Sequence, residues 1–239
     1  KLYLTDAGQI LKDSLETLQS DDHRMKIRMQ QSMAGKKGLT FGVTMTIGEY
    51  AVIPSLARFL KAHPQWEIHI CYGNTQTLLS RLREGTLDFA IVEGYFREDL
   101  YTTRILQKEP FIGVASSKHI FQKPVSCLRD LTGERLLLRE HGSGTRAILT
   151  KILALNNLSA EDFSHIIEIE NIHAIVSLLR EDCGISFLYQ SAVQKELEDK
   201  TLIEIPLSDF KIAHDFSFIW NKDSIFSAQY EAIFQELQK

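Results

Sequence analysis

Small polar residues stand at points where an apolar strand is expected to pass into a helix. Thr44 and Thr46 follow the apolar run 39–43, and later junctions carry hydroxyl, amide, imidazole and glycine groups. In open α/β sheets, ligands bind beyond the carboxyl ends of the strands, where helix N-termini present free N–H groups to anions. These residue types predict a site for a small polar, anionic ligand. The candidates are Thr44, Met45, Thr46, Glu93, Gly94, His141, Ser143, Gly144, Thr145, Asn171 and His173.

Several of these hydroxyls have a purely structural alternative. Thr46 with Glu49 three residues later fits a capping box, which would place the Thr46 side chain on the first turn of a helix. Thr44 is not used by such a cap, so it is the stronger ligand candidate. Ser143 or Thr145 would serve equally well as the cap of the next helix, although the glycines beside them let backbone approach a ligand closely.

Glu93 and His173 complicate the prediction of an anionic ligand. A carboxylate at residue 93 would repel an anion, so Glu93 either accepts a hydrogen bond from the ligand or pairs with Arg139 or Arg146 across a cleft. His173 near a helix start is better explained as a surface residue than as a ligand contact.

The sequence does not favour catalysis, and it predicts neither a cofactor nor a metal. Residues 141–145 (HGSGT) lack the lysine and spacing of a phosphate-binding loop and the pattern of a nucleophile elbow. The eight histidines show no metal-binding spacing, and the three cysteines are interpreted as small buried residues in a reducing compartment. An enzyme or a solute-binding protein on the same fold stays as the alternative.

From residue 39 onward, apolar runs alternate with amphipathic segments. This βαβ succession predicts mainly parallel sheets with right-handed crossovers, in two α/β subdomains with a cleft between them. Asn74 is expected to cap one helix and Gly85 to end it. The expected strands are 39–44, 66–73, 87–94, 110–117, 135–140, 165–171, 184–190, 201–207 and 214–220, and the expected helices are 49–64, 74–85, 143–157, 172–182, 191–199 and 224–237.

A long helix is expected before this domain, from residue 5 to about residue 34. At 1.5 Å per residue it would span roughly 45 Å, longer than a small domain is wide. Its narrow apolar stripe predicts packing on a partner helix, and the alternative is a surface helix on its own domain. Asp21 and Asp22 are interpreted as part of a solvated face, and 35–38 (GKKG) as a short hinge. The stripe contains Leu4, Leu11, Leu15, Leu18 and Met25.

Composition narrows the class of protein. The 239 residues are 44% hydrophobic and 24% charged, as in ordinary globular proteins. A formal net charge of −4 argues against this stretch binding nucleic acid by itself. No apolar run approaches the roughly 20 residues of a membrane span, so a cytoplasmic location is predicted.

Taken in order, four stretches resemble LysR-type transcriptional regulators, and together they extend over essentially the whole chain. They are LYLTDAG before the long helix, residues 35–94 from GKKGLTFGVT to LDFAIVEG, LLREHGSGTR and EDCGISFLYQSAV. The resemblance implies a linker helix that pairs protomers, followed by an effector-binding domain of the periplasmic-binding-protein type. It also implies a winged helix-turn-helix head upstream, through which the regulator would bind DNA as a dimer or tetramer.

The resemblance further implies domain boundaries and an effector class. The end of the wing, the linker helix and the hinge would occupy 1–38, lobe I 39–110 and 214–239, and lobe II 111–213. The effector cleft would lie at the junctions named above. The VEG and REHGSGT phrases resemble regulators of inorganic sulfur or carbon assimilation, which implies a sulfur oxyanion or a small carboxylate as effector.

Overall fold

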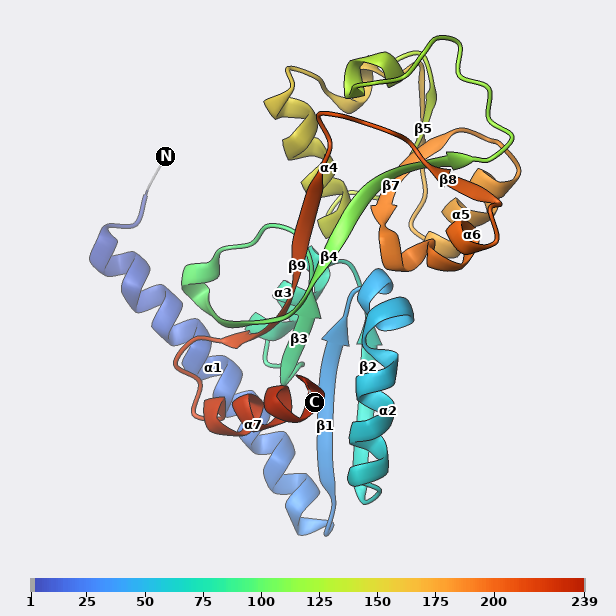
Figure 1. The fold of residues 1–239 in the computed structure, drawn as a ribbon. Coiled ribbons are helices and arrows are strands. Elements are labelled where there is room, and N and C mark those ends of the chain that lie inside the picture. Colours follow the sequence, from blue (N-terminus) through green and yellow to red (C-terminus); the bar gives the residue numbers. More distant parts are fainter. Residues whose placement is uncertain (1–2, 239) are drawn as a thin grey trace.

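The computed structural model describes residues 3–238, and the assignments that fall on residues 1–2 and 239 lie outside this range. A single helix, α1 (Asp6–Met33), precedes two stacked α/β lobes (Figure 1). This confirms the long N-terminal helix and the two-lobed α/β architecture. Within the described residues no helix has the length and apolar character to span a membrane.

Lobe I contains the first βαβαβ unit. Strand β1 (Lys37–Val43) pairs in parallel with β2 (Trp66–Tyr72) and β3 (Phe89–Val92), and helices α2 (Ile53–Ala62) and α3 (Thr75–Arg83) connect them. The Asn74 side chain accepts the backbone N–H of Thr77 at 3.0 Å, and Gly85 has a positive φ of 70° after the helix. Both predicted ends of α3 are therefore confirmed.

Lobe II repeats the plan. Strand β5 (Arg135–Leu138) pairs in parallel with β6 (His165–Glu168) and β7 (Ile185–Tyr189). Helices α4 (Gly144–Leu155) and α5 (Ile172–Arg180) connect these strands. The short helix α6 (Gln194–Glu198) and strand β8 (Leu202–Glu204) follow.

Two long antiparallel strands join the lobes. Strand β4 (Tyr101–Ser116) pairs with β9 (Ile212–Asn221), and α7 (Ser227–Gln238) returns the chain to lobe I. One mixed sheet results, in the order β2-β1-β3-β9-β4-β7-β5-β6, with β8 beside β4. The sequence predicted only the second half of β4. The predicted boundaries between the lobes lie directly after Pro110 in β4 and directly after Ala213 in β9. These two residues are paired in the sheet.

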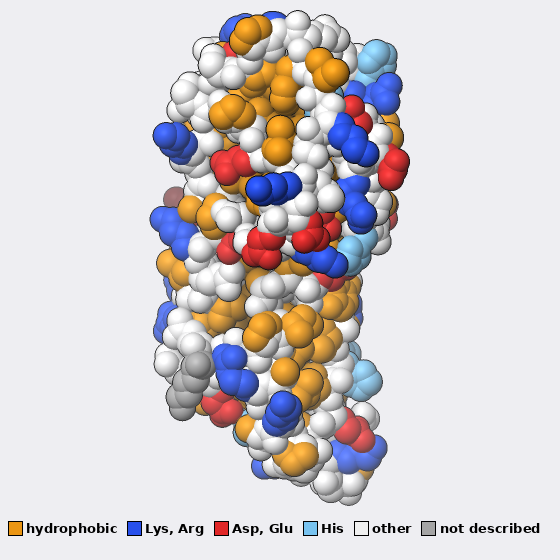
Figure 2. All heavy atoms as spheres, turned by 45° about the vertical axis from the view of Figure 1, so that its right-hand side comes forward, with side chains coloured by type: hydrophobic (Ala, Val, Ile, Leu, Met, Phe, Trp, Pro, Cys, Tyr) orange, Lys and Arg blue, Asp and Glu red, His pale blue; other side chains and the backbone are white. Residues whose placement is uncertain are grey.

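An aromatic core runs along the sheet. The Phe89 ring stacks on Phe41 at 4.8 Å and on Phe218 at 4.2 Å between ring centroids. On the face drawn in Figure 2, charged side chains of both signs gather at the waist between the lobes, and hydrophobic side chains gather on lobe I below it. The prediction of buried cysteines is wrong: Cys71, Cys127 and Cys183 are free thiols with partly exposed side chains.

The segment predicted as a hinge is a tight turn. Gly35 has a positive φ of 69°, and β1 begins at Lys37. Motion at this turn would also have to break the ion pairs of Arg24 and Arg28 on α1 with Asp88 of lobe I. The hinge therefore stays a prediction.

Candidate functional site

The predicted polar junctions meet at the boundary between the lobes. The loop after β5 in lobe II lies against the start of α3 in lobe I. The Gln76 backbone N–H donates to the Gly142 carbonyl at 3.2 Å, and the Asn74 side-chain amide donates to the His141 carbonyl at 3.4 Å. The lobes are thus in direct contact at the carboxyl ends of their strands.

Glu93 stands at the centre of this boundary, directly after β3. Its Oε2 accepts the hydroxyl of Thr44 from lobe I, and its Oε1 accepts the hydroxyl of Thr145 from lobe II at 3.3 Å. The Thr75 hydroxyl donates to the Glu93 carbonyl at 2.8 Å. All four side chains are buried. One internal carboxylate therefore bridges the lobes, and the hydroxyl predicted to face a ligand is bonded to it.

Burial dominates the electrostatics of Glu93. Desolvation raises the pKa of the Glu93 carboxyl above its usual 4.5. The hydrogen bond from Thr44 and the positive charge of Arg139 act in the opposite direction. Arg139 is therefore the electrostatic partner of Glu93 across the boundary, whereas Arg146 pairs with Glu168.

This shift predicts a specific pH dependence. Because the folded-state pKa of Glu93 is raised, the stability that protonation of this carboxyl confers is complete below pH 4.5 and is lost as pH rises through the folded-state pKa. In Glu93→Gln the side chain stays neutral at every pH. Urea unfolding across this range should show the glutamine variant gaining stability relative to wild type as pH rises, by about 1.4 kcal/mol for each unit of pKa difference. A pH-independent difference would contradict the assignment.

Arg139 has an unused donor at the cleft. Its guanidinium is bonded to Glu140 through Nε at 2.8 Å and Nη2 at 3.2 Å. The third nitrogen, Nη1, is buried without a hydrogen-bond partner among the described residues, and so are the Tyr189 hydroxyl and the Ser191 hydroxyl. Arg139 is 4% exposed, and a guanidinium N–H of this kind can donate to an anionic oxygen.

A pocket of about 550 Å³ opens at this point between the lobes. Its walls carry three of the predicted residues, Met45, His141 and Asn171, together with Arg139. Its lining also includes three carboxylates and several lobe I residues: Tyr72, Gly73, Asn74, Thr77, Glu140, Glu168 and Glu170. The predicted Ser143 and Gly144 instead line a second pocket, of about 690 Å³, on the side of this loop that faces α3 and α4.

The prediction that Thr46 and Glu49 form a capping box is wrong. Thr46 has helical backbone angles, makes no capping hydrogen bond and leads into a single π-helical turn, Ile47–Ala51. Glu49 instead reaches across the cleft, with Oε2 at 3.2 Å from Nε2 of His173. The Tyr50 hydroxyl lies 3.1 Å from the other nitrogen of the same ring. His173 is thus a contact between the lobes.

Four other predicted residues have structural partners. The Ser143 hydroxyl caps α4, and Asn171 caps α5 by accepting the Ala174 N–H at 2.9 Å. Gly94, with a φ of 93°, packs on Gly144 so tightly that a Cβ on Gly94 would lie 2.5 Å from the Gly144 Cα. These residues shape the boundary through backbone geometry.

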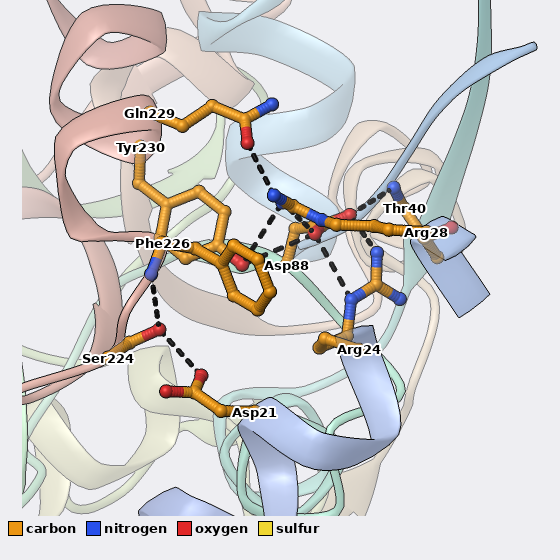
Figure 3. Close-up of polar contacts among 9 residues, drawn as sticks. All are labelled: Asp21, Arg24, Arg28, Thr40, Asp88, Ser224, Phe226, Gln229 and Tyr230. Atoms are coloured by element: carbon orange, nitrogen blue, oxygen red, sulfur yellow. Dashed lines mark hydrogen bonds and ion pairs between the residues drawn. The ribbon is translucent and has the colours of Figure 1, made fainter. Parts of the chain in front are cut away.

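A second polar cluster fixes α1 to lobe I (Figure 3). Asp88, fully buried before β3, forms ion pairs with Arg24 and, at 2.8 Å, with Arg28. The same carboxylate accepts the backbone N–H of Thr40 at 2.8 Å and the Tyr230 hydroxyl at 3.3 Å. One aspartate thus joins α1, β1 and α7.

The interpretation of Asp21 as a solvated residue is wrong. Asp21 is 6% exposed, and its carboxylate accepts the Ser224 hydroxyl at 2.6 Å and the Ile225 N–H at 2.9 Å. Asp22 is exposed and pairs with Lys26. The polar side of α1 therefore faces its own domain.

The apolar stripe of α1 consequently faces outward. The exposed fractions are 54–62% for the leucines and 41% for the methionine of the predicted set: Leu4, Leu11, Leu15, Leu18 and Met25. Nothing in the described residues covers this stripe, which lies opposite the Asp88 cluster.

Sequence reasoning missed Tyr189, Ser191 and Asp88. Tyr189 ends β7, which runs parallel to β5, so its position at the same carboxyl edge was available from the strand order. Asp88 gave no comparable signal, because a single aspartate before a strand is common in loops.

Comparison with known proteins identifies the family. Residues 35–239 match the model of the LysR substrate-binding domain. The chain is 27% identical over 244 residues to a "Probable RuBisCO transcriptional regulator" of Thalassiosira pseudonana, covering 99% of this chain and 80% of that protein. It is 28% identical over 225 residues to the transcriptional activator CmpR of Synechocystis, covering 93% of this chain and 72% of that protein.

Solved structures show the same fold. The regulatory domain of CcmR from Synechocystis, in complex with 2-PG, superimposes with a TM-score of 0.74 at 19% identity, covering 85% of this chain and 96% of that one. The effector-binding domain of QuiR, in complex with shikimate, gives a TM-score of 0.70 at 20% identity, covering 85% and 95%. The chain therefore belongs to the LysR family of transcriptional regulators, and residues 35–239 form its effector-binding domain.

Proposed function

We propose that this domain binds a small polar, anionic metabolite between its lobes and relays binding to DNA-binding heads upstream of α1. The observation that carries the proposal is Arg139, which lines the interlobe pocket and has a buried Nη1 without a hydrogen-bond partner among the described residues. Binding would act by population shift, since an effector that contacts both lobes favours one arrangement of the lobes over others.

Two solved effector domains support the binding of a small molecule by a domain of this fold. Each is described as a complex with a small molecule, 2-PG for CcmR and shikimate for QuiR. For the present chain we propose a sulfur oxyanion or a small carboxylate, because hydroxyl and guanidinium donors line the boundary between the lobes. The carboxylates among the lining residues of the pocket, such as Glu140 and Glu170, would repel a second anionic group, so we propose a ligand with a single compact one.

The outward stripe of α1 supports self-association. Two copies of α1 packed through Leu11 and Leu18 would remove these side chains from water and leave the polar side on lobe I undisturbed. We propose a dimer or tetramer that works in the cytoplasm, where the heads reach DNA. An enzyme on this fold is the alternative, and incubation with each ligand that binds would reveal it through turnover.

A thermal-shift screen across inorganic anions and metabolic acids tests the proposal. In Arg139→Gln, the affinity for the compound with the largest shift should fall roughly 10- to 150-fold by calorimetry, because a hydrogen bond to a charged group is worth about 1.5–3 kcal/mol. Arg135→Gln is the matched control, since it removes an exposed charge at the other end of β5. Equal losses in the two variants, or no shift with any compound, would contradict an interlobe anion site.

A further inference from the structure

We propose that Glu93 is a tethered competitor for the effector's anionic group. Its carboxylate engages the donors of the interlobe site, and an anion binds there when this carboxylate is displaced. The inference rests on the proposed function, and it adds a residue that determines which ligands the site accepts.

The bonds of Glu93 are those that a bound oxyanion would form. Its two oxygens accept one hydroxyl from each lobe, those of Thr44 and Thr145, and the charge of Arg139 lies close enough to stabilise it. A ligand carboxylate or sulfate between the lobes would draw on the same donors. Above its folded-state pKa, Glu93 is thus an anion of the chain itself that joins the two lobes.

The site offers more donors than this carboxylate uses. Nη1 of Arg139 and the hydroxyl of Tyr189 are buried without partners among the described residues, and the charge of Glu93 acts on Tyr189. Burial raises the pKa of Tyr189, so its hydroxyl stays a neutral donor. A carboxylate has two oxygens, whereas sulfate or phosphate has four, so the donor set matches an oxyanion of the latter kind better than it matches Glu93.

The charge of Glu93 also lowers the affinity of the site for an anionic ligand. Two anions side by side in a buried site repel each other strongly, because the local dielectric is low. An anionic ligand therefore binds weakly while the carboxylate stays in place. Removing the charge, or the whole side chain, should turn this boundary into an ordinary anion site.

Inorganic sulfate is the probe for this test. We expect its affinity, measured by isothermal titration calorimetry on the full chain at a pH above the folded-state pKa of Glu93 that the urea experiment locates, to rise at least tenfold in Glu93→Gln. It should rise further in Glu93→Ala, which also vacates the space. Glu236→Gln is the control, since it removes one carboxylate charge from a 40% exposed side chain on α7 and should leave sulfate affinity unchanged. Circular dichroism establishes that each variant is folded.

The outcomes are distinct. Sulfate affinity in both Glu93 variants equal to or below that of wild type would overturn the competitor role, and so would an equal gain in Glu236→Gln. If Glu93→Gln failed to fold, the Glu93→Ala measurement would decide alone. Failure of the proposed function would appear differently, as a wild-type protein that responds to none of the screened metabolites, or as an Arg139→Gln variant that keeps full affinity for the compound that binds.

Discussion

Replacing Asp88 by asparagine should lower the free energy of unfolding by about 3–5 kcal/mol. The Arg24 and Asp88 side chains are 3% and 0% exposed, and the same carboxylate also pairs with Arg28. Loss of the negative charge leaves the Arg24 guanidinium buried without its counter-ion, which is the costly way to break such a pair. Urea unfolding followed by circular dichroism measures the change.

Asp22→Asn is the matched control, since it removes the same charge from the exposed side of α1. The Asp22 and Lys26 side chains are 51% and 67% exposed, and surface pairs of this kind contribute only about 0–1 kcal/mol. A loss below about 1 kcal/mol in Asp88→Asn would show that α1 is not held by this cluster. Comparable losses in both variants would lead to the same conclusion.

The contacts of Asp88 bear on which part of the protein moves when effector binding changes the cleft. Because α1 is joined to β1 and α7 through one buried carboxylate, α1 and lobe I are expected to move as one body. Lobe II is then the part that moves when the cleft changes, about the crossing strands β4 and β9. Figure 1 shows β4 and β9 with their flanking loops passing from one lobe to the other.

The sequence predicted most helices and strands, but it did not predict which side chains form hydrogen bonds and ion pairs with one another. Hydrophobic periodicity located α1, both βαβ units and the caps of α3, because these depend on local spacing. It missed the first half of β4, whose residues Thr102 to Glu109 mix polar and apolar types because the strand crosses between lobes, with half-exposed faces on both sides. It also misassigned Thr46, because a π-helical turn replaces the capped start that the T-x-x-E spacing suggests.

For the candidate site, too, the sequence predicted the position in the fold but not the contacts between side chains. Parallel topology predicted that the carboxyl ends of the strands meet between the lobes. The same topology singled out Thr44 as a candidate residue of the site. That the Thr44 hydroxyl would be bonded to Glu93, and that Arg139 would keep one free N–H, depends on contacts across some 50 residues of chain separation. No local pattern encodes such contacts.

The second large effect concerns self-association through α1. Leu11 and Leu18 are 61% and 62% exposed, whereas burying a leucine side chain fully is worth about 1.5–3 kcal/mol. Changing both to aspartate should raise the dimer dissociation constant by at least about 100-fold, since each 1.4 kcal/mol is a factor of ten. Sedimentation over a range of concentrations measures it.

The control pair for this experiment is Ile120→Asp with Leu155→Asp. These side chains are 87% and 75% exposed, lie on lobe II, and place the same number of new charges far from α1. The control should remain dimeric. A wild-type monomer, or a dimer whose dissociation constant is unchanged by the two substitutions in α1, would contradict pairing through this helix.

The substitutions in α1 and at Asp88 also test whether the two sides of the helix act independently. Leu11 and Leu18 are more than half exposed, and Leu18 only borders lobe I at a groove that it lines with Leu100. Their replacement should therefore leave the unfolding free energy of the monomer nearly unchanged, whereas Asp88→Asn should weaken the fold and leave the α1 stripe intact. If each change affects only its own property, α1 joins two partners independently: a second protomer through its apolar side and lobe I through its polar side. In that case a displacement of lobe I would pass into the dimer through α1 itself, and the predicted hinge at 35–38 would not be needed.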